Sequence, residues 1–214
     1  MLRSLGLLGA DTVTQVCGAG RIGVRFDGDL VELSATPHDL VGPVADELVA
    51  AIVADLGLSL TDLAGPVYVA GCGLSFAHIP AVPDAVARAK VSTRPLAEYV
   101  PAIETQDPFE GINLVAVSGT APELSVHARV FVPGLSVPED PATGAAAAGL
   151  GIALVAAGLL PEGGRYDIRQ GIEMGRPSRL MGRVDATDGA ATLCHVAGQV
   201  QHVASGEIAV PPLS

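Results

Sequence analysis

The sequence predicts an α+β fold in which β-strands surround one central helix. Residues 142–160 contain no charged side chain and are apolar all round, which is typical of a buried central helix. On both sides of this segment, short runs alternate between apolar and polar residues, which is the period of a half-buried strand. Glycine, proline or aspartate bounds these runs, as expected where strands turn.

The first elements are expected within residues 2–38. Residues 2–8 are similar to the last turns of a helix that ends at Gly9. Residues 12–33 show period two on both sides of an Asp27-Gly28 turn, which predicts a β-hairpin. The Thr-Pro-His tripeptide at 36–38 is typical of a linker.

Mixed elements follow up to the central helix. Apolar residues at helical spacing predict a helix over 41–56, which residues 60–64 extend or restart. A strand is expected at 66–69, and one or two short helices within 82–100. The remaining expected elements are strands at 112–118 and 126–132, the long helix over 143–160, and strands at 165–170, 179–185, 191–197 and 206–210.

Composition narrows the function classes. The 214 residues are 49% hydrophobic, which is enough for one large domain or two small ones with a real core. A formal net charge of -11 without a basic run opposes nucleic acid and acidic membrane surfaces as partners. Three widely spaced cysteines, Cys17, Cys72 and Cys194, suggest neither a disulfide framework nor a zinc knuckle, so we expect a cytoplasmic protein.

The apolar segment at 142–160 has a second interpretation, because its length approaches the roughly 20 residues that cross a bilayer. Its first half consists mainly of alanine and glycine, which insert weakly, and no lysine or arginine flanks it closely. A buried central helix is therefore favoured over a membrane span.

The start of this helix has the features of an anion site. Two acids, Glu139 and Asp140, precede Pro141, Thr143 and Gly144, where the helix is expected to begin. Helix starts carry unpaired backbone N–H groups and the positive end of the helix dipole, so a carboxylate or phosphate can bind there. Asp140 could then move a proton beside the anion. The alternative is that Asp140 or Thr143 merely caps the helix.

Other motifs carry less information. Gly18, Gly20 and Gly23 match the GxGxxG dinucleotide fingerprint, but strand periodicity continues after them, so a glycine-rich turn is favoured. The five histidines show no metal-binding spacing, and we expect neither a metal nor a cofactor. Glu139 is expected to be a solvated or supporting neighbour of the site, and Arg176 to form a structural ion pair.

Three strings together resemble one family. They are FVPGLSVPEDPATGAA, RQGIEMGRPS from Arg169 to Ser178, and HVAGQVQHVASGEIAVP near the C-terminus. The chain resembles the PhzF-like proteins of phenazine biosynthesis, which share a fold with diaminopimelate epimerase. The resemblance implies two pseudo-repeated domains, each a mostly antiparallel sheet wrapped around a central helix, with the active site in the cleft where the two helix starts meet.

The resemblance also implies an activity and site residues. The family isomerises or epimerises small carboxylic acids by proton transfer, without metal, flavin or pyridoxal phosphate. Asp140 matches the acid of the second domain, and Gln170 matches a glutamine that lines the cleft, so both are predicted to be catalytic. Thr143, Gly144 and Ala145 match the anion-binding turn, with Ala145 where the family usually has serine.

The resemblance places a catalytic glutamate and a GHPT turn ahead of the point where this chain starts. We therefore expect residues 1–37 to be a remnant of the N-terminal domain, rejoined by 206–214, and residues 38–205 to be the C-terminal domain. The leading hypothesis is an isomerase acting on a small carboxylate, in a homodimer. The alternative is a non-catalytic protein that binds an anion or a partner and has lost the glutamate.

Overall fold

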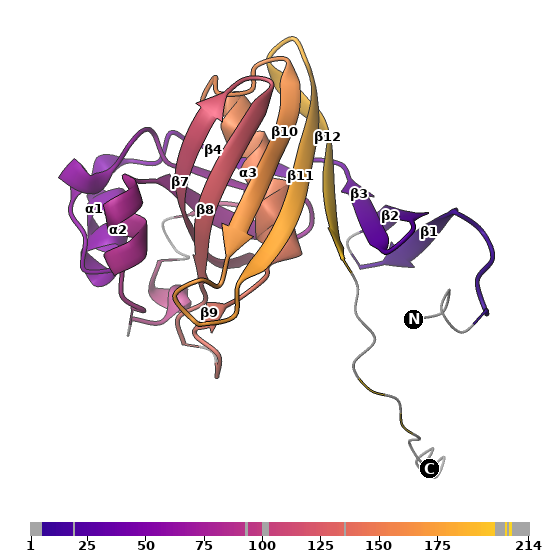
Figure 1. Cartoon of the computed structure of the whole chain (residues 1–214). Coiled ribbons are helices and arrows are strands. Elements are labelled where there is room, and N and C mark those ends of the chain that lie inside the picture. Colours follow the sequence, from indigo (N-terminus) through magenta and orange to yellow (C-terminus); the bar gives the residue numbers. More distant parts are fainter. Residues whose placement is uncertain are drawn as a thin grey trace.

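A computed structural model describes residues 6–18, 20–92, 94–99, 103–134, 136–199, 204 and 206. It confirms the predicted α+β class (Figure 1). The helices of the described part are α1 (Asp46–Asp55), α2 (Pro83–Arg88) and α3 (Gly144–Ala156), with short 3-10 turns at Leu60–Asp62 and Leu96–Glu98.

The strands among the described residues belong to one 12-stranded sheet in the order β1-β2-β3-β12-β11-β10-β8-β7-β6-β5-β4, with β9 paired to β8. The pairings β8–β10 and β6–β7 are parallel, and the others are antiparallel. The strands are β1 (Thr12–Cys17), β2 (Gly20–Asp27), β3 (Leu30–Ala35), β4 (Asp39–Val41), β5 (Tyr68–Gly71), β6 (Ser75–Pro80), β7 (Phe109–Thr120), β8 (Glu123–Phe131), β9 (Glu139–Asp140), β10 (Gly163–Gln170), β11 (Ser178–Thr187) and β12 (Ala190–Gln199).

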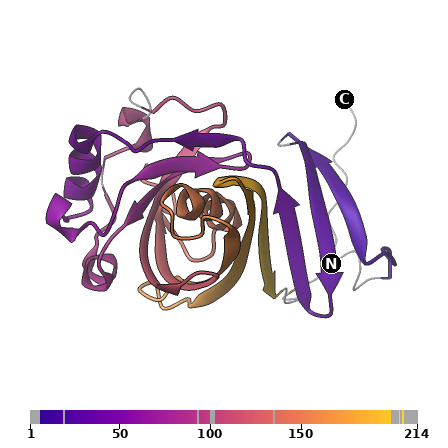
Figure 2. The same cartoon turned by 90° about the horizontal axis from the view of Figure 1, so that it is seen from above.

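The sheet curls around α3 (Figure 2). Residues 146–155 of α3 are all buried, and they pack against inward side chains such as Tyr166 and Ile168 of β10 and Val184 of β11. Such enclosure explains why the helix carries no polar face. It also supports a buried helix over a membrane span, and no helix in the described part of the chain is long and apolar enough to cross a bilayer.

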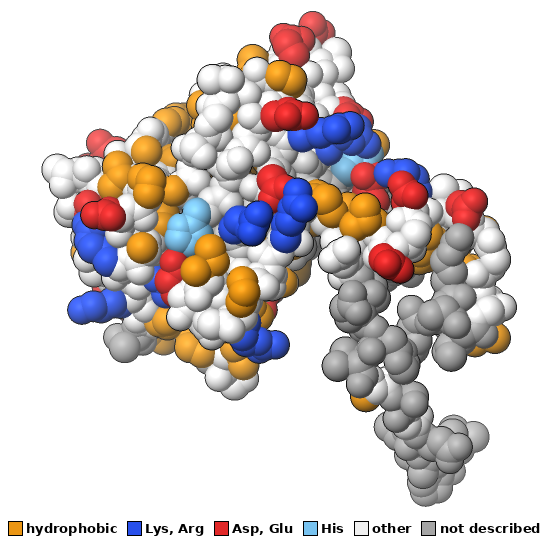
Figure 3. Space-filling view, in the orientation of Figure 1, with side chains coloured by type: hydrophobic (Ala, Val, Ile, Leu, Met, Phe, Trp, Pro, Cys, Tyr) orange, Lys and Arg blue, Asp and Glu red, His pale blue; other side chains and the backbone are white. Residues whose placement is uncertain are grey.

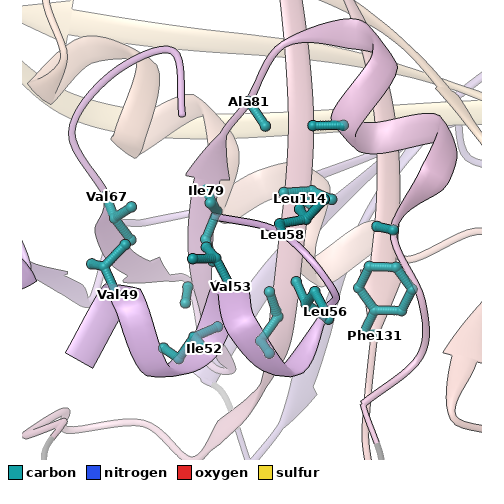
Figure 4. Close-up of a cluster of buried hydrophobic side chains, with 14 of the residues drawn as sticks. Val49, Ile52, Val53, Leu56, Leu58, Val67, Ile79, Ala81, Leu114 and Phe131 are labelled. Atoms are coloured by element: carbon teal, nitrogen blue, oxygen red, sulfur yellow. The ribbon is translucent and has the colours of Figure 1, made fainter. Parts of the chain in front are cut away.

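A second core lies on the outer face of β5, β6 and β7, under α1 and α2 (Figure 4). Val49, Ile52 and Val53 on one side of α1 pack in the same cluster as Val69 of β5. The next residue of β5, Ala70, belongs to the core around α3. The sheet is therefore buried on both faces here, because successive residues of a strand point to opposite sides.

The N-terminal strands extend the sheet beyond α3 (Figures 1 and 2). The predicted hairpin is present as β2 and β3, with Gly28 at a φ of +58° in the turn. Gly18 lies in the turn between β1 and β2, so the GxGxxG match belongs to a strand connection, as favoured from the sequence. β3 pairs with β12, so this hairpin joins the sheet that surrounds α3.

Several predicted boundaries were wrong for local reasons. α1 begins at Asp46 instead of residue 41, because Gly42 has a φ of +136°, which no helix allows. α3 ends at Ala156 instead of residue 160, because Gly158 adopts a φ of +72° and its N–H bonds to the Val155 carbonyl. The N–H of Leu159 bonds to the Leu154 carbonyl, which completes a Schellman motif.

Other elements differ from the prediction or fall outside the described residues. The expected helix extension at 60–64 is a 3-10 turn, and β4, β6 and β9 were not predicted. Residues 6–8 of the expected N-terminal helix form a turn, whereas residues 2–5 are not among the described residues. The strand expected at 206–210 also lies outside them, apart from Gly206.

Candidate anion site at the start of helix α3

The two-residue strand β9 places its two acids on opposite faces of the sheet. Asp140 pairs with Val130 of β8, and Glu139 pairs with Phe131. Val130 packs with Ala146 of α3, so its partner Asp140 is on the side of the central helix. Glu139 consequently points to the outer side, where α1 and α2 lie.

Glu139 is not a solvated neighbour of the site but holds strand β9 in place through a buried ion pair. Its carboxylate accepts hydrogen bonds of 2.8 and 2.9 Å from the Nε and Nη2 atoms of Arg129, and both residues are buried. Arg129 also donates to the carbonyls of Val86 and Ala89, at the end of α2. This buried pair ties β8, β9 and α2 together and fixes the backbone of Asp140. The expectation of a supporting residue was right, and that of a solvated one was wrong.

Asp140, Thr143 and Gln170 form one hydrogen-bonded unit. The Thr143 hydroxyl donates to Asp140 Oδ2 at 2.6 Å. The Gln170 Nε2 group donates to the Asp140 carbonyl at 2.7 Å and to Thr143 Oγ1 at 3.1 Å. Gln170 Oε1 accepts the Thr143 N–H at 3.2 Å. Gln170 is only 2% exposed, so these bonds hold the turn between β9 and α3 in one conformation.

The backbone at the start of α3 is open. Neither Asp140 nor Thr143 caps the helix through its side chain, because the Thr143 hydroxyl is committed to Asp140. In the part of the chain that the structure describes, the N–H groups of Gly144, Ala145 and Ala146 have no hydrogen-bond partner. Gly144 is exposed, and a Cβ atom at this position would contact nothing within 4 Å.

This arrangement can bind an anion. Three unpaired N–H groups converge at the positive end of a 13-residue helix, which favours a carboxylate or a phosphate. The capping interpretation, which was left open from the sequence, is wrong for both side chains.

The RQGIEMGRPS string forms the turn beside this unit. Gly171 has a φ of +76°, and a Cβ atom there would lie 2.4 Å from the Arg176 carbonyl oxygen and 2.9 Å from that of Pro141. Only glycine fits such close backbone packing. Arg176 is exposed and forms no ion pair within the described residues, so the expected structural ion pair is not observed there.

Residues on and near β6, which the sequence did not indicate as a group, lie on another side of the start of α3. Phe76 of β6 packs with Ala145 and Ala146 at the start of α3. Next to it, the Ser75 hydroxyl donates to buried Asp39 at 2.8 Å. Burial alone would raise the pKa of Asp39, but the N–H groups of residues 106 and 107 and the Ser75 hydroxyl outweigh it, so the pKa is lowered. Asp39 thus stays ionised and ties the 106–107 loop to β6.

A groove in the described part of the surface lies away from the start of α3. It has a volume of about 620 Å³ and runs over the outer face of β10, β11 and β12 toward β2 and β3. Its charged side chains, visible as mixed blue and red atoms in Figure 3, include the ion pairs Arg25–Glu32 and Arg179–Asp167. These pairs already neutralise each other, and the groove includes no residue of the α3 start. The start of α3 is therefore the better candidate for an anion.

The sequence model of the phenazine biosynthesis-like protein family matches residues 1–206, nearly the whole of this chain. The chain belongs to the phenazine biosynthesis-like protein family. Trans-2,3-dihydro-3-hydroxyanthranilate isomerase of Pseudomonas aeruginosa is 38% identical over 80 residues, 37% of this chain and 29% of that protein. An uncharacterized isomerase of Mesorhizobium japonicum is 37% identical over 87 residues, 40% of this chain and 29% of that protein. The matches thus span less than a third of these relatives.

Solved structures of a predicted epimerase and of a PhzF-family protein have the same fold. A predicted epimerase from Pseudomonas aeruginosa is similar with a TM-score of 0.76 and 26% identity, over 96% of this chain and 70% of that chain. A PhzF-family protein of Bacillus anthracis has a TM-score of 0.69 and 19% identity, over 92% of this chain and 69% of that chain. The second similarity shows the fold alone.

Proposed function

We propose that this PhzF-family chain carries the Asp140 half of a cofactor-free isomerase or epimerase site for a small carboxylic acid. The observation that carries the proposal is the set of unpaired N–H groups at Gly144, Ala145 and Ala146, next to a carboxylate held by Thr143. The substrate carboxylate accepts hydrogen bonds from these N–H groups. Asp140 Oδ2 receives the Thr143 hydroxyl, which leaves Oδ1 to exchange a proton with the substrate.

The reaction moves one proton and needs no redox partner. Asp140 and a second acid-base group share the work: one removes a proton from a carbon of the substrate, and the other returns a proton to a second carbon or to the opposite face. The curated relatives named trans-2,3-dihydro-3-hydroxyanthranilate isomerases make that compound the first substrate to assay. In this scheme Gln170 positions Asp140 and Thr143, while its predicted contact with substrate stays a prediction.

The division into domains belongs to the same proposal. We expect residues 38–205 to form the C-terminal domain around α3, and residues 1–37, rejoined by 206–214, to be a remnant of the N-terminal domain that faces it across the cleft. The second acid-base group is assigned to that facing side of the cleft. A homodimer remains the expected assembly.

Asp140→Asn tests the catalytic role. The amide keeps the shape and still accepts the Thr143 hydroxyl, but it carries no exchangeable acid proton. We expect isomerisation of trans-2,3-dihydro-3-hydroxyanthranilate, followed as deuterium uptake from D2O by NMR, to fall by about 100-fold or more. The melting temperature should stay within about 2 °C, which is no more than the change that a loss of about 1 kcal/mol produces in a chain of this length.

Asp188→Asn is the matched control, because Asp188 is exposed in the turn between β11 and β12 at a φ of 52°, which asparagine tolerates. Its turnover should equal that of the wild type. Wild-type turnover in Asp140→Asn would remove Asp140 from the mechanism.

The alternative is a protein that binds an anion without turnover. It is favoured by one observation: among the described residues, Asp140 is the one carboxylate hydrogen-bonded at the start of α3. Anthranilate binding by the wild type, without deuterium uptake in either the wild type or Asp140→Asn, would support this second candidate. Deuterium uptake that depends on Asp140 would eliminate it.

A further inference from the structure

Three side chains on the outer face of the sheet form a hydrogen-bonded chain that the site at α3 does not use. They are Ser34 of β3, His195 of β12 and Asp185 of β11. Ser34 Oγ lies 2.8 Å from His195 Nδ1, and His195 Nε2 lies 3.1 Å from Asp185 Oδ2. A hydroxyl, an imidazole and a carboxylate are thus connected in the order that activates a nucleophile through an oriented base.

The strand register brings these residues together although they are distant in the sequence. Ser34 lies opposite His195 in the pairing of β3 with β12, and His195 lies opposite Arg183 in the pairing of β12 with β11. Cys194 and Val196, the neighbours of His195, belong to the core around α3, so His195 points to the outer face. In the described part of the chain, no helix lies over this face of β10 and β11 (Figure 1).

The carboxylate determines which ring nitrogen of His195 can accept a proton. Burial would raise the pKa of Asp185, but the hydrogen bond with His195 and the charge of Arg183 outweigh it, so the pKa is lowered. Ionised Asp185 can only accept a hydrogen bond, so Nε2 of neutral His195 carries the ring hydrogen. Nδ1 is therefore left to take the proton of the Ser34 hydroxyl. His195 is 6% exposed, which holds the ring in this orientation.

The Ser34 hydroxyl lies beside an open groove. Ser34 is half-buried, and on its other side β2 presents Gly23, which has no side chain to cover it. Glu32, Ala197 and Met181 lie two residues away on the same three strands, and they line the groove of about 620 Å³. Four arginines and four carboxylates line this groove, so it has no net charge, and Ala197 and Met181 add apolar surface. This lining favours a small uncharged ligand.

We propose that Ser34, His195 and Asp185 are a second catalytic site, which hydrolyses small uncharged carboxylic esters bound in this groove. Ser34 is the nucleophile and His195 is the base, whereas Asp185 is a positioning residue that acts through His195. The proposal is independent of the isomerase site, because it uses no residue at the start of α3.

The reaction needs only water as a co-reactant. Ser34 Oγ forms a bond to the carbonyl carbon of the ester while its proton moves to His195 Nδ1. The bond from that carbon to the alcohol oxygen then breaks, and the alcohol leaves with the proton from His195. Water attacks the acyl group on Ser34 and gives one proton to His195, which returns it to Ser34 as the acid leaves. One ester and one water thus give one acid and one alcohol.

Two guanidinium groups flank the site and can stabilise the negative oxygen that forms during the attack. Arg183 lies opposite His195, and its Nη1 atom donates to Asp185 Oδ1. Arg25 lies opposite Glu32, and its Nε atom donates to Glu32 Oε1 at 3.2 Å. Positive charge that is already oriented lowers the barrier to an oxyanion.

The test incubates the full chain with p-nitrophenyl acetate and follows p-nitrophenol by absorbance. We expect hydrolysis above the rate in buffer, and phenylmethylsulfonyl fluoride should leave its sulfonyl group on Ser34, as located by peptide mapping. Ser34→Ala should lose this label and reduce hydrolysis by about 100-fold or more. Ser118→Ala is the matched control, because Ser118 is an exposed strand residue outside the groove, and its turnover should equal that of the wild type.

Two changes at residue 185 test the positioning role. Asp185→Asn places an amide N–H opposite Nε2, so the ring hydrogen moves to Nδ1, which then cannot accept the Ser34 proton. We expect kcat to fall by about 100-fold with KM within about twofold, and Asp185→Glu to recover about tenfold of the loss. The proposal is overturned if Ser34 stays unlabelled, if Ser34→Ala hydrolyses the ester as fast as the wild type, or if Asp185→Asn keeps the wild-type kcat.

Discussion

At the scale of single residues, adjacent side chains in this molecule have separate tasks because a strand alternates them between two faces. Glu139 points outward to Arg129, and Asp140 points toward the start of α3. The Glu139 carboxylate on the outer side is buried and paired with Arg129. The Asp140 carboxylate on the inner side lies beside unpaired backbone N–H groups. The sequence string EDP thus encodes both an anchor and a candidate acid.

Glu139→Gln should destabilise the fold strongly. The amide removes the negative charge but leaves the Arg129 guanidinium buried, and an unpaired buried charge costs roughly 3 kcal/mol or more. Glu173, at 3.9 Å from Arg129 Nε, compensates part of this loss. We expect the free energy of unfolding, measured by urea denaturation, to fall by about 3 kcal/mol.

The matched control is Glu98→Gln, which breaks an ion pair with Arg94 that has a similarly short contact, 2.7 Å, between the arginine Nε and the carboxylate. Its carboxylate is 53% exposed and the Arg94 side chain is 41% exposed, so water replaces the lost partner. The expected loss is below about 0.5 kcal/mol. Equal losses in the two variants would show that the Arg129–Glu139 pair does not anchor β9.

At the scale of elements, the two ends of helix α3 differ in whether their backbone groups are paired. A Schellman motif pairs the backbone at the C-terminal end, whereas the N-terminal end keeps its N–H groups free for a ligand. The first helical position is also where proline is best tolerated, since its missing N–H has no intrahelical partner.

Gly144→Pro therefore tests the anion site without breaking the helix. Thr143 already has the extended conformation that proline requires of its predecessor, with φ at -111° and ψ at 96°, and a Cβ atom at residue 144 has open space. The variant removes one N–H donor, so we expect the dissociation constant for anthranilate, measured by calorimetry, to rise about 10-fold.

Gly144→Ala is the matched control, because it adds a Cβ atom and keeps the N–H group. Its affinity should stay close to that of the wild type. An unchanged affinity in Gly144→Pro, with a melting temperature like that of Gly144→Ala, would show that the start of α3 does not bind the carboxylate.

The elements that sequence periodicity predicted are those with a local signal. The hairpin of β2 and β3 has an Asp-Gly turn between alternating residues, and α3 is a long apolar run. β6 was missed because its residues, SFAHIP, are buried on both faces and show no alternation. β9 has two residues and exists only because Arg129 and the β8 backbone hold it.

At the scale of the whole molecule, the strand order could not be predicted from periodicity. β3 pairs with β12 across most of the chain, and this pairing depends on how the complete sheet curls around α3. For the site, Asp140 and residues 143–145 came from a contiguous motif, whereas Arg129 had no local signal.

The stability of the whole molecule depends on pH through His78, because this histidine is buried between the two cores. This side chain is 2% exposed; its Nε2 atom contacts the Ala70 carbonyl at 3.3 Å, and its Nδ1 atom contacts the Asn113 amide at 3.1 Å. Burial lowers the pKa of His78 from 6.5 to about 4, although the Ala70 carbonyl acts in the opposite direction. The folded state therefore keeps His78 neutral at pH values where the unfolded chain binds a proton.

Stability from this group is fully present above pH 6.5 and is lost as the pH falls toward 4, by roughly 2 kcal/mol at pH 5. Urea denaturation between pH 7.5 and 5 should show this loss in the wild type. It should also show the loss in His38→Gln, whose wild-type side chain is 35% exposed, but not in His78→Gln, which cannot take up the proton. Parallel pH profiles for His78→Gln and the wild type would mean that another group causes the loss.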